Sequence, residues 1–166
     1  MIYLIWLLRI IHIVAGVFWV GGALFMTFFV APTVGALGEP GQKFVGHLMN
    51  NLKFSNRMAI ASGLTILAGA ILFALDARAG EAWLRSDFAR GLGLGAAFAV
   101  VGFVFGILVG RNTKALAQLG SQIQGKPTSE QLMRMQGIQN QLRTYSIINV
   151  VSLILATVFM AIARYL

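Results

Sequence analysis

Four long apolar stretches constrain the fold of this chain more than any other feature. A helix needs about 20 mostly apolar residues to cross the hydrocarbon core of a bilayer. Four segments qualify, and we place them at about residues 2–31, 58–75, 91–110 and 147–162. Because backbone polar groups find no water inside a membrane, segments of this kind span it as helices. The sequence therefore predicts an all-α, four-transmembrane-helix up-down bundle in which residues 1–166 form a single integral membrane domain.

The composition supports this interpretation and excludes several classes of protein. Hydrophobic residues make up 58% of the chain and charged residues only 11%, whereas soluble domains carry about 25% charged residues. A water-soluble globular protein is therefore excluded. The chain has no cysteine, which rules out disulfides, zinc–thiolate sites, iron–sulfur clusters and thiol catalysis. The net charge of +8 reflects basic loops between apolar runs, a membrane-protein pattern, and does not indicate nucleic-acid binding.

The distribution of Lys and Arg predicts the orientation in the membrane. The first and third loops contain Lys43, Lys53, Arg57, Arg111, Lys114, Lys126, Arg134 and Arg143, against Glu39 and Glu130. The second loop balances Arg78, Arg85 and Arg90 with Asp76, Glu81 and Asp87. Since basic loops stay in the cytoplasm, we expect a multi-pass protein of the bacterial inner membrane with both termini in the periplasm.

Both basic loops contain helix signals. Gly125-Lys126-Pro127 predicts a helix end, and Thr128-Ser129-Glu130-Gln131 has the pattern of a capping box that begins the next helix. We therefore expect a cytoplasmic helical hairpin that extends the third and fourth helices beyond the membrane. In the first loop, Phe44, Leu48 and Leu52 follow Pro40 at helical spacing, which indicates a short amphipathic helix.

Glycines recur along the third span. Gly102, Gly106 and Gly110 are four residues apart, and small residues at this spacing let membrane helices approach closely. Three interpretations remain open from spacing alone: packing inside the bundle, the seam of a homodimer, or room for a flat cofactor.

Two ionisable residues interrupt the first span, and such residues indicate a functional site by default. Arg9, His12, Gly16 and Trp19 fall within one arc about 80° wide on a helix. A haem uses an imidazole for its iron, a bare backbone patch, a cation for a propionate and an aromatic neighbour. The same pattern also suits a histidine hydrogen-bonded to another helix, with Arg9 reaching the interface, or a site of proton or metal transfer.

Methionines supply further candidate ligands. Met160 of the fourth span lies near the expected depth of His12, and His/Met ligation of haem iron is a known pairing. On the cytoplasmic side, imidazole and thioether groups that suit Cu(I) occur at His47, Met49, Met58, Met133 and Met135. No span contains Asp or Glu, and no nucleophile triad or phosphate-binding glycine motif is present, so we do not expect a self-sufficient enzyme.

The first helix resembles the opening helix of small bacterial membrane proteins that include the CopD-like copper-resistance domain proteins and the HemJ-type protoporphyrinogen oxidases. The likeness rests on Trp6, Arg9 and His12, then Trp19 with Gly21-Gly22, and the closing run Phe28 to Pro32. It implies that His12 is an axial ligand of haem b, with Arg9 in the basic position and Trp19 in the aromatic one.

The same resemblance weakens elsewhere. After Asn149, the oxidases have an acid and a proline where this chain has Val150 and Ser152, and the third span lacks their lysine or histidine. The expected function is therefore haem-b-dependent electron transfer or haem handling, with a possible redox partner, and not protoporphyrinogen oxidation. A non-catalytic scaffold or accessory subunit and a copper-handling protein are the alternatives.

Overall fold

The computed structural model describes residues 2–123 and 127–166, and within these ranges every element is helical and none is a strand. Four helical stretches are long and apolar enough to cross a membrane: Ile2–Leu37, Phe54–Ala77, Asp87–Gln122 and Ser129–Tyr165. Each contains most or all of one segment expected from the sequence. The prediction of an all-helical protein with four apolar, membrane-length helices is confirmed.

The first stretch is longer than expected, and its α-helical hydrogen bonding is interrupted by a π-helical turn before a proline. α1 (Ile2–Phe25) leads into a π-helical turn, η1 (Met26–Val30), and then into α2 (Ala31–Leu37). Pro32 has no N–H and its ring crowds the carbonyl four residues earlier, which disturbs the α-helical hydrogen bonds before it. The Ala31 N–H bonds to the Met26 carbonyl five residues back, and the Thr33 hydroxyl donates to the Phe29 carbonyl at 2.7 Å. The helix therefore continues to Leu37 instead of ending near residue 31.

The first loop forms the short helix that the sequence predicted. α3 (Glu39–Asn50) turns back against α2. The two helices lie so close together that a Cβ on Gly41 would be 2.8 Å from the Val34 backbone, which is closer than real Cβ atoms approach. Leu52 lies beyond the end of α3, so the amphipathic helix is slightly shorter than its apolar spacing suggested. α4 (Phe54–Ala77) then forms the second apolar helix.

The remaining chain forms one short helix and two long ones. A single-turn helix that the sequence did not predict, α5 (Glu81–Leu84), precedes α6 (Asp87–Gln122). α7 (Ser129–Ile162) starts at the expected capping box, in which Thr128 and Gln131 bond reciprocally, and ends in a short 3₁₀ turn, η2 (Ala163–Tyr165). The helix end expected at 125–127 falls mostly outside the described residues, and α6 ends at Gln122.

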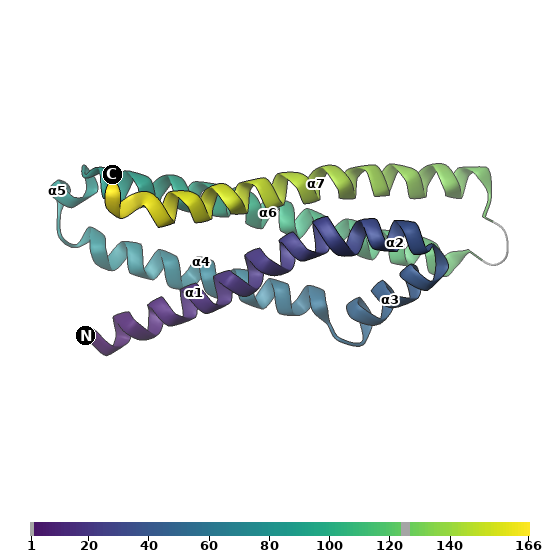
Figure 1. The fold of residues 1–166 in the computed structure, drawn as a ribbon, viewed down its shortest axis with the longest axis horizontal. Helices are drawn as coiled ribbons and strands as arrows, with labels where there is room; N and C mark the ends of the chain where they lie inside the picture. Colours follow the sequence, from purple (N-terminus) through teal and green to yellow (C-terminus); the bar gives the residue numbers. More distant parts are fainter. Residues whose placement is uncertain (1, 124–126) are drawn as a thin grey trace.

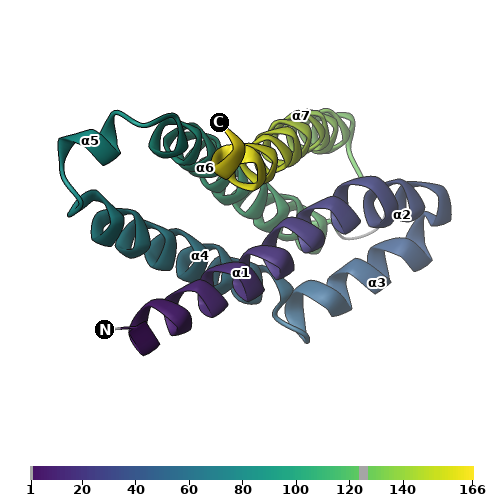
Figure 2. The same cartoon turned by 60° about the vertical axis from the view of Figure 1, so that its left-hand side comes forward.

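The long helices associate as two hairpins. α1 packs along α4, α6 packs along α7, and contacts between these two pairs are far fewer. Figure 1 shows α1 and α6 running one way and α4 and α7 the other, with both termini at the end that carries α5. Figure 2 shows the two pairs side by side and crossing at an angle. We call α1–α4 the first hairpin and α6–α7 the second hairpin.

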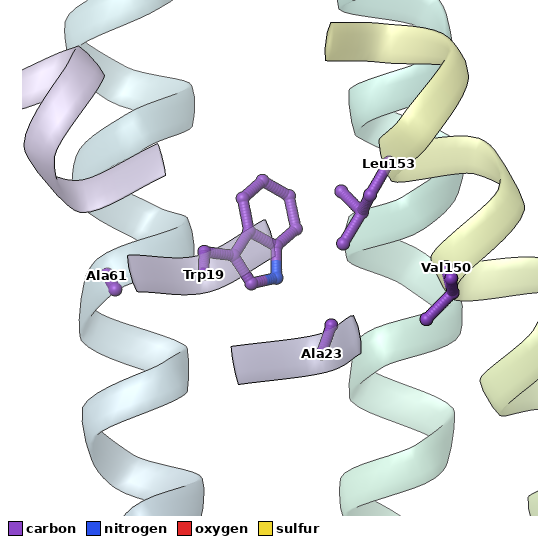
Figure 3. Packing of buried hydrophobic residues seen from close by; sticks show 5 residues of the cluster. All are labelled: Trp19, Ala23, Ala61, Val150 and Leu153. Atoms are coloured by element: carbon purple, nitrogen blue, oxygen red, sulfur yellow. The ribbon is translucent and has the colours of Figure 1, made fainter. Parts of the chain in front are cut away.

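The two hairpins meet at a small apolar core. Trp19 and Ala23 of α1 and Ala61 of α4 pack against Val150 and Leu153 of α7. Figure 3 shows the Trp19 side chain reaching from α1 across the space toward Leu153. Val150 and Leu153 are the most completely buried large side chains among the described residues. The core therefore lies between the hairpins, about two turns along α1 from His12.

Candidate functional site

His12 is held by the backbone of the neighbouring helix α4. Its Nδ1 lies 2.8 Å from the Thr65 carbonyl oxygen. A carbonyl oxygen can only accept, so Nδ1 carries the hydrogen, and in a neutral imidazole the lone pair is then on Nε2. The carbonyl has a second lone pair, so it can accept this bond without leaving the helix ladder. His12 is thus a single-tautomer side chain with one nitrogen committed to α4.

The other ring nitrogen, Nε2, takes no part in this hydrogen bond. No hydrogen bond reaches His12 Nε2 from the residues that the structure describes. Those residues also include no fully buried side-chain nitrogen or oxygen that lacks a partner, so Nε2 keeps accessible surface. The imidazole is half-buried within an apolar span. An accessible nitrogen lone pair in this position is a possible ligand for a metal.

Two glycines lie in the seam between α1 and α4 near His12, and at one of them the helices approach too closely for a side chain. A Cβ on Gly69 of α4 would lie 2.8 Å from His12 Cε1 and 2.9 Å from Nδ1, which is closer than real side chains approach. On α1, a Cβ on Gly16 would lie 3.5 Å from the Thr65 methyl group. Gly16, expected to lie against a porphyrin, therefore faces α4 within the first hairpin.

The other two members of the expected one-face set lie apart from the His12 ring. Trp19 is only 4% exposed and meets Phe103 of α6 edge to face in the core between the hairpins. Arg9 is exposed, one turn from His12 toward the N-terminal end of α1, and takes part in none of the salt bridges among the described residues. The four side chains of the shared arc thus have different surroundings: His12 and Gly16 face α4, Trp19 lies in the core, and Arg9 lies at the surface.

Met160 packs in the second hairpin. A Cβ on Gly95 of α6 would lie 2.8 Å from Met160 Cγ, so this methionine fills the space over a glycine of its own hairpin. His12 is held on α4 of the other hairpin. Met160 and His12 thus pack against different helices, Met160 against α6 and His12 against α4.

The glycines of the third span are also used within the chain. A Cβ on Gly102 would lie 2.8 Å from Leu153 Cδ2, and one on Gly106 would lie 3.2 Å from Asn149 Nδ2. A Cβ on Gly110, in contrast, would meet nothing within 4 Å outside its own helix backbone. Of the three open interpretations, packing inside the bundle is the one these contacts favour, and they support no homodimer seam at Gly102 or Gly106.

The candidate copper ligands lie in different surroundings. Met49 of α3 accepts a hydrogen bond from the Ser55 hydroxyl at 3.3 Å, and Met58 packs against Gly22 of α1. His47 is exposed on α3, which packs on α2 and α4, whereas Met133 and Met135 belong to α7. Figures 1 and 2 show α3 and α7 on opposite sides of α2. Among the described residues, these candidates are therefore divided between the elements α3 and α4 and the helix α7.

Sequence reasoning missed the face of α4 on which Thr65 and Gly69 meet His12. Ser62 and Thr65 are buried, and their hydroxyls donate to carbonyls of their own helix. Ser62, Thr65 and Gly69 recur at intervals of three and four, which puts them on one face and was the available signal. Asn149 of α7 is the matching polar residue of the second hairpin, and its Nδ2 donates to the Gly102 carbonyl at 2.6 Å.

A pocket elsewhere in the molecule is separate from His12. It has a volume of about 190 Å³, is apolar, and lies where η1, α2 and α3 meet, with Phe25, Phe29 and Phe44 among its walls. Among the described residues no three His, Cys, Asp or Glu side chains group closely enough to hold a metal ion together.

Comparisons with protein-family models, with curated proteins and with solved structures find no match to this chain, so a functional assignment rests on the geometry of its own residues.

Proposed function

We propose that this protein is a haem-b-binding, cytochrome-like integral membrane protein in which His12 is an axial ligand and which serves electron transfer or haem handling. The observation that carries the proposal is the hydrogen bond between His12 Nδ1 and the Thr65 carbonyl, which leaves an accessible Nε2 inside an apolar span. Histidines that bind metals commonly donate their other ring N–H to a carbonyl or carboxylate in this way.

The residues around His12 fit a haem in part. Nε2 suits the iron, and the exposed Arg9 suits a propionate one turn closer to the surface. Gly16 and Trp19 are engaged in helix packing, so on this chain they support the ligand helix and do not form a porphyrin surface. When bound, haem b would supply one-electron redox chemistry, and the protein would hold the imidazole orientation and limit access of water.

We further propose that the chain crosses the bacterial inner membrane four times as an up-down bundle, with both termini in the periplasm. At the end that carries α5, the charges of the second loop are balanced by the pairs Arg85–Glu81 and Arg90–Asp87. Of the described basic residues outside the four observed ion pairs, Lys53, Arg57, Arg111, Lys114 and Arg143 belong to the opposite side, whereas Arg9, Arg78 and Arg164 belong to the α5 end. This difference supports a cytoplasmic location for the opposite end.

Helix lengths support a cytoplasmic extension of the second hairpin. The 36 residues of α6 extend about 54 Å, which exceeds a hydrocarbon core about 30 Å thick. The α6–α7 pair stays joined in its extended part, where Asn112 Nδ2 donates to Gln141 Oε1 at 3.1 Å. If the α5 end lies in the periplasm, the surplus length projects into the cytoplasm.

The haem proposal is tested by titrating ferric haem into protein purified in mild detergent from haem-deficient cells. We expect saturation at one haem per chain, with a Soret shift, for the wild type and for His47→Ala. His47 is the matched control because it is the only other histidine and lies exposed on α3. His12→Ala should lose the Soret shift while keeping its helical circular dichroism. A full shift with folded His12→Ala would contradict the ligand assignment.

A scaffold or accessory subunit is the second candidate function. Its support is the apolar surface of the α7 extension, where Leu132 is 45% and Met133 65% exposed. This reading predicts a colourless protein in haem-sufficient cells. It also predicts that Leu132→Ser with Met133→Ser reduces the size of the complex extracted in mild detergent, and an unchanged complex would count against it.

A further inference from the structure

We propose that Gly69 of α4 is a positioning residue for His12: by leaving room for the imidazole edge, it lets the Thr65 carbonyl fix the Nδ1–H tautomer and makes Nε2 the only ligating atom. This inference rests on the proposed haem function for its role, although the positioning itself is a property of the protein alone. The inference concerns Thr65 and Gly69 of α4, which lie in a different span from His12.

The contact geometry gives the reason why position 69 must be glycine. A Cβ there would lie 2.8 Å from His12 Cε1 and 2.9 Å from Nδ1, but 3.8 Å from Nε2. The ring edge that faces α4 is therefore the Nδ1–Cε1 edge. Any side chain at position 69 would push this edge away from α4 and lengthen the 2.8 Å bond to the Thr65 carbonyl.

The second contact of Thr65 helps to set the register between the helices. Its methyl group lies opposite Gly16, one turn along α1 from His12, and its hydroxyl donates to the Ala61 carbonyl at 2.8 Å. The hydroxyl is thus occupied within α4, and the carbonyl is the group that receives the imidazole. Because a backbone carbonyl cannot be removed by substitution, Gly69 is the position at which the arrangement can be broken.

The chain offers a matched control on the same helix. A Cβ on Gly63 of α4 would meet nothing within 4 Å, so Gly63→Ala changes helix propensity in the same way as Gly69→Ala without touching His12. A His47→Gln background leaves His12 as the sole histidine of the chain. All histidine ring signals in the NMR spectrum then belong to His12.

The test is ¹⁵N–¹H NMR of the His12 ring in haem-free protein, followed by haem titration of the same samples. We expect a protonated Nδ1 and an unprotonated Nε2 in the background protein and in Gly63→Ala, and loss of this pattern in Gly69→Ala. Haem affinity should fall roughly 10–100-fold in Gly69→Ala, the range that outer partners of a ligating histidine usually contribute, and stay unchanged in Gly63→Ala.

The two measurements separate this inference from the haem proposal. An Nε2–H tautomer in the background protein would overturn the inference whether or not haem binds, and so would an unaltered ring spectrum in Gly69→Ala. If the ring spectra behave as expected but no variant binds haem, the positioning holds and the proposed function fails. Should Gly69→Ala not fold, an Nε2–H tautomer of His12 in the background protein would still overturn the inference.

Discussion

Trp19 of α1 meets Phe103 of α6 edge to face, with ring centroids 6.3 Å apart and ring planes at 85°. This contact joins the two hairpins. Every side-chain hydrogen bond between long helices that the described residues form stays within one hairpin: His12 to Thr65 in the first, and Asn149 to Gly102 and Asn112 to Gln141 in the second. The association of the hairpins therefore depends on apolar packing.

Trp19→Ala should weaken that association strongly. We expect the free energy of unfolding to fall by roughly 3 kcal/mol, the lower end for a large-to-alanine core substitution, because lipid removes part of the water-transfer contribution. The measurement is unfolding in mixed micelles with increasing dodecyl sulfate, followed by circular dichroism. Trp6→Ala is the control, since Trp6 is 55% exposed, and equal losses for both variants would contradict the packing described here.

Asn149 provides the polar bond of the second hairpin inside the apolar region. Asn149→Ala removes the 2.6 Å bond to the Gly102 carbonyl, and interhelical bonds of this kind contribute about 0.6 to 2 kcal/mol in membranes. We expect a loss within that range by the same unfolding measurement. Asn112→Ala, which breaks an exposed bond between α6 and α7, should change the free energy of unfolding less.

The glycines of α6 should respond to alanine according to their contacts. Gly102→Ala would place a methyl 2.8 Å from Leu153 Cδ2 and should destabilise the α6–α7 pair. Gly110→Ala meets nothing within 4 Å and should leave stability unchanged or slightly raised, since alanine favours the helix by about 1 kcal/mol. If Gly102→Ala instead left stability intact and only changed the oligomeric state, a seam between copies would replace the intrachain packing.

The proposed orientation can be tested because the chain has no cysteine of its own. Ala82→Cys places a thiol on exposed α5, and Gln118→Cys places one on the exposed surface of the α6 extension. In intact spheroplasts, a membrane-impermeant maleimide should label residue 82 at once and residue 118 only after lysis. Labelling of residue 118 at once and of residue 82 only after lysis would contradict the proposed orientation.

Sequence periodicity predicted the positions of the long helices well, but it did not predict which helices pack against one another. Apolar length was enough to find the four long helices, and the Thr128–Gln131 capping box marked the start of α7 because its bonds are local. The π-helical turn before Pro32 and the single turn of α5 depend on local backbone adjustments that no apolar period reports.

The candidate site was predictable only in part for the same reason. Helical spacing puts Arg9, His12, Gly16 and Trp19 on one arc, but it does not say which helix each side chain meets. In the structure His12 and Gly16 meet α4, Trp19 meets the core, and Arg9 lies at the surface. Thr65 and Gly69 become recognisable as partners of His12 only once the register between α1 and α4 is known.

A visible absorption spectrum of the protein purified in mild detergent from haem-sufficient cells, before and after dithionite, tests directly whether His12 holds haem b. We expect a Soret band that sharpens on reduction together with resolved α and β bands, and their loss in His12→Ala but not in His47→Ala. A flat spectrum from folded wild-type protein, made with haem available, would overturn the proposed haem function.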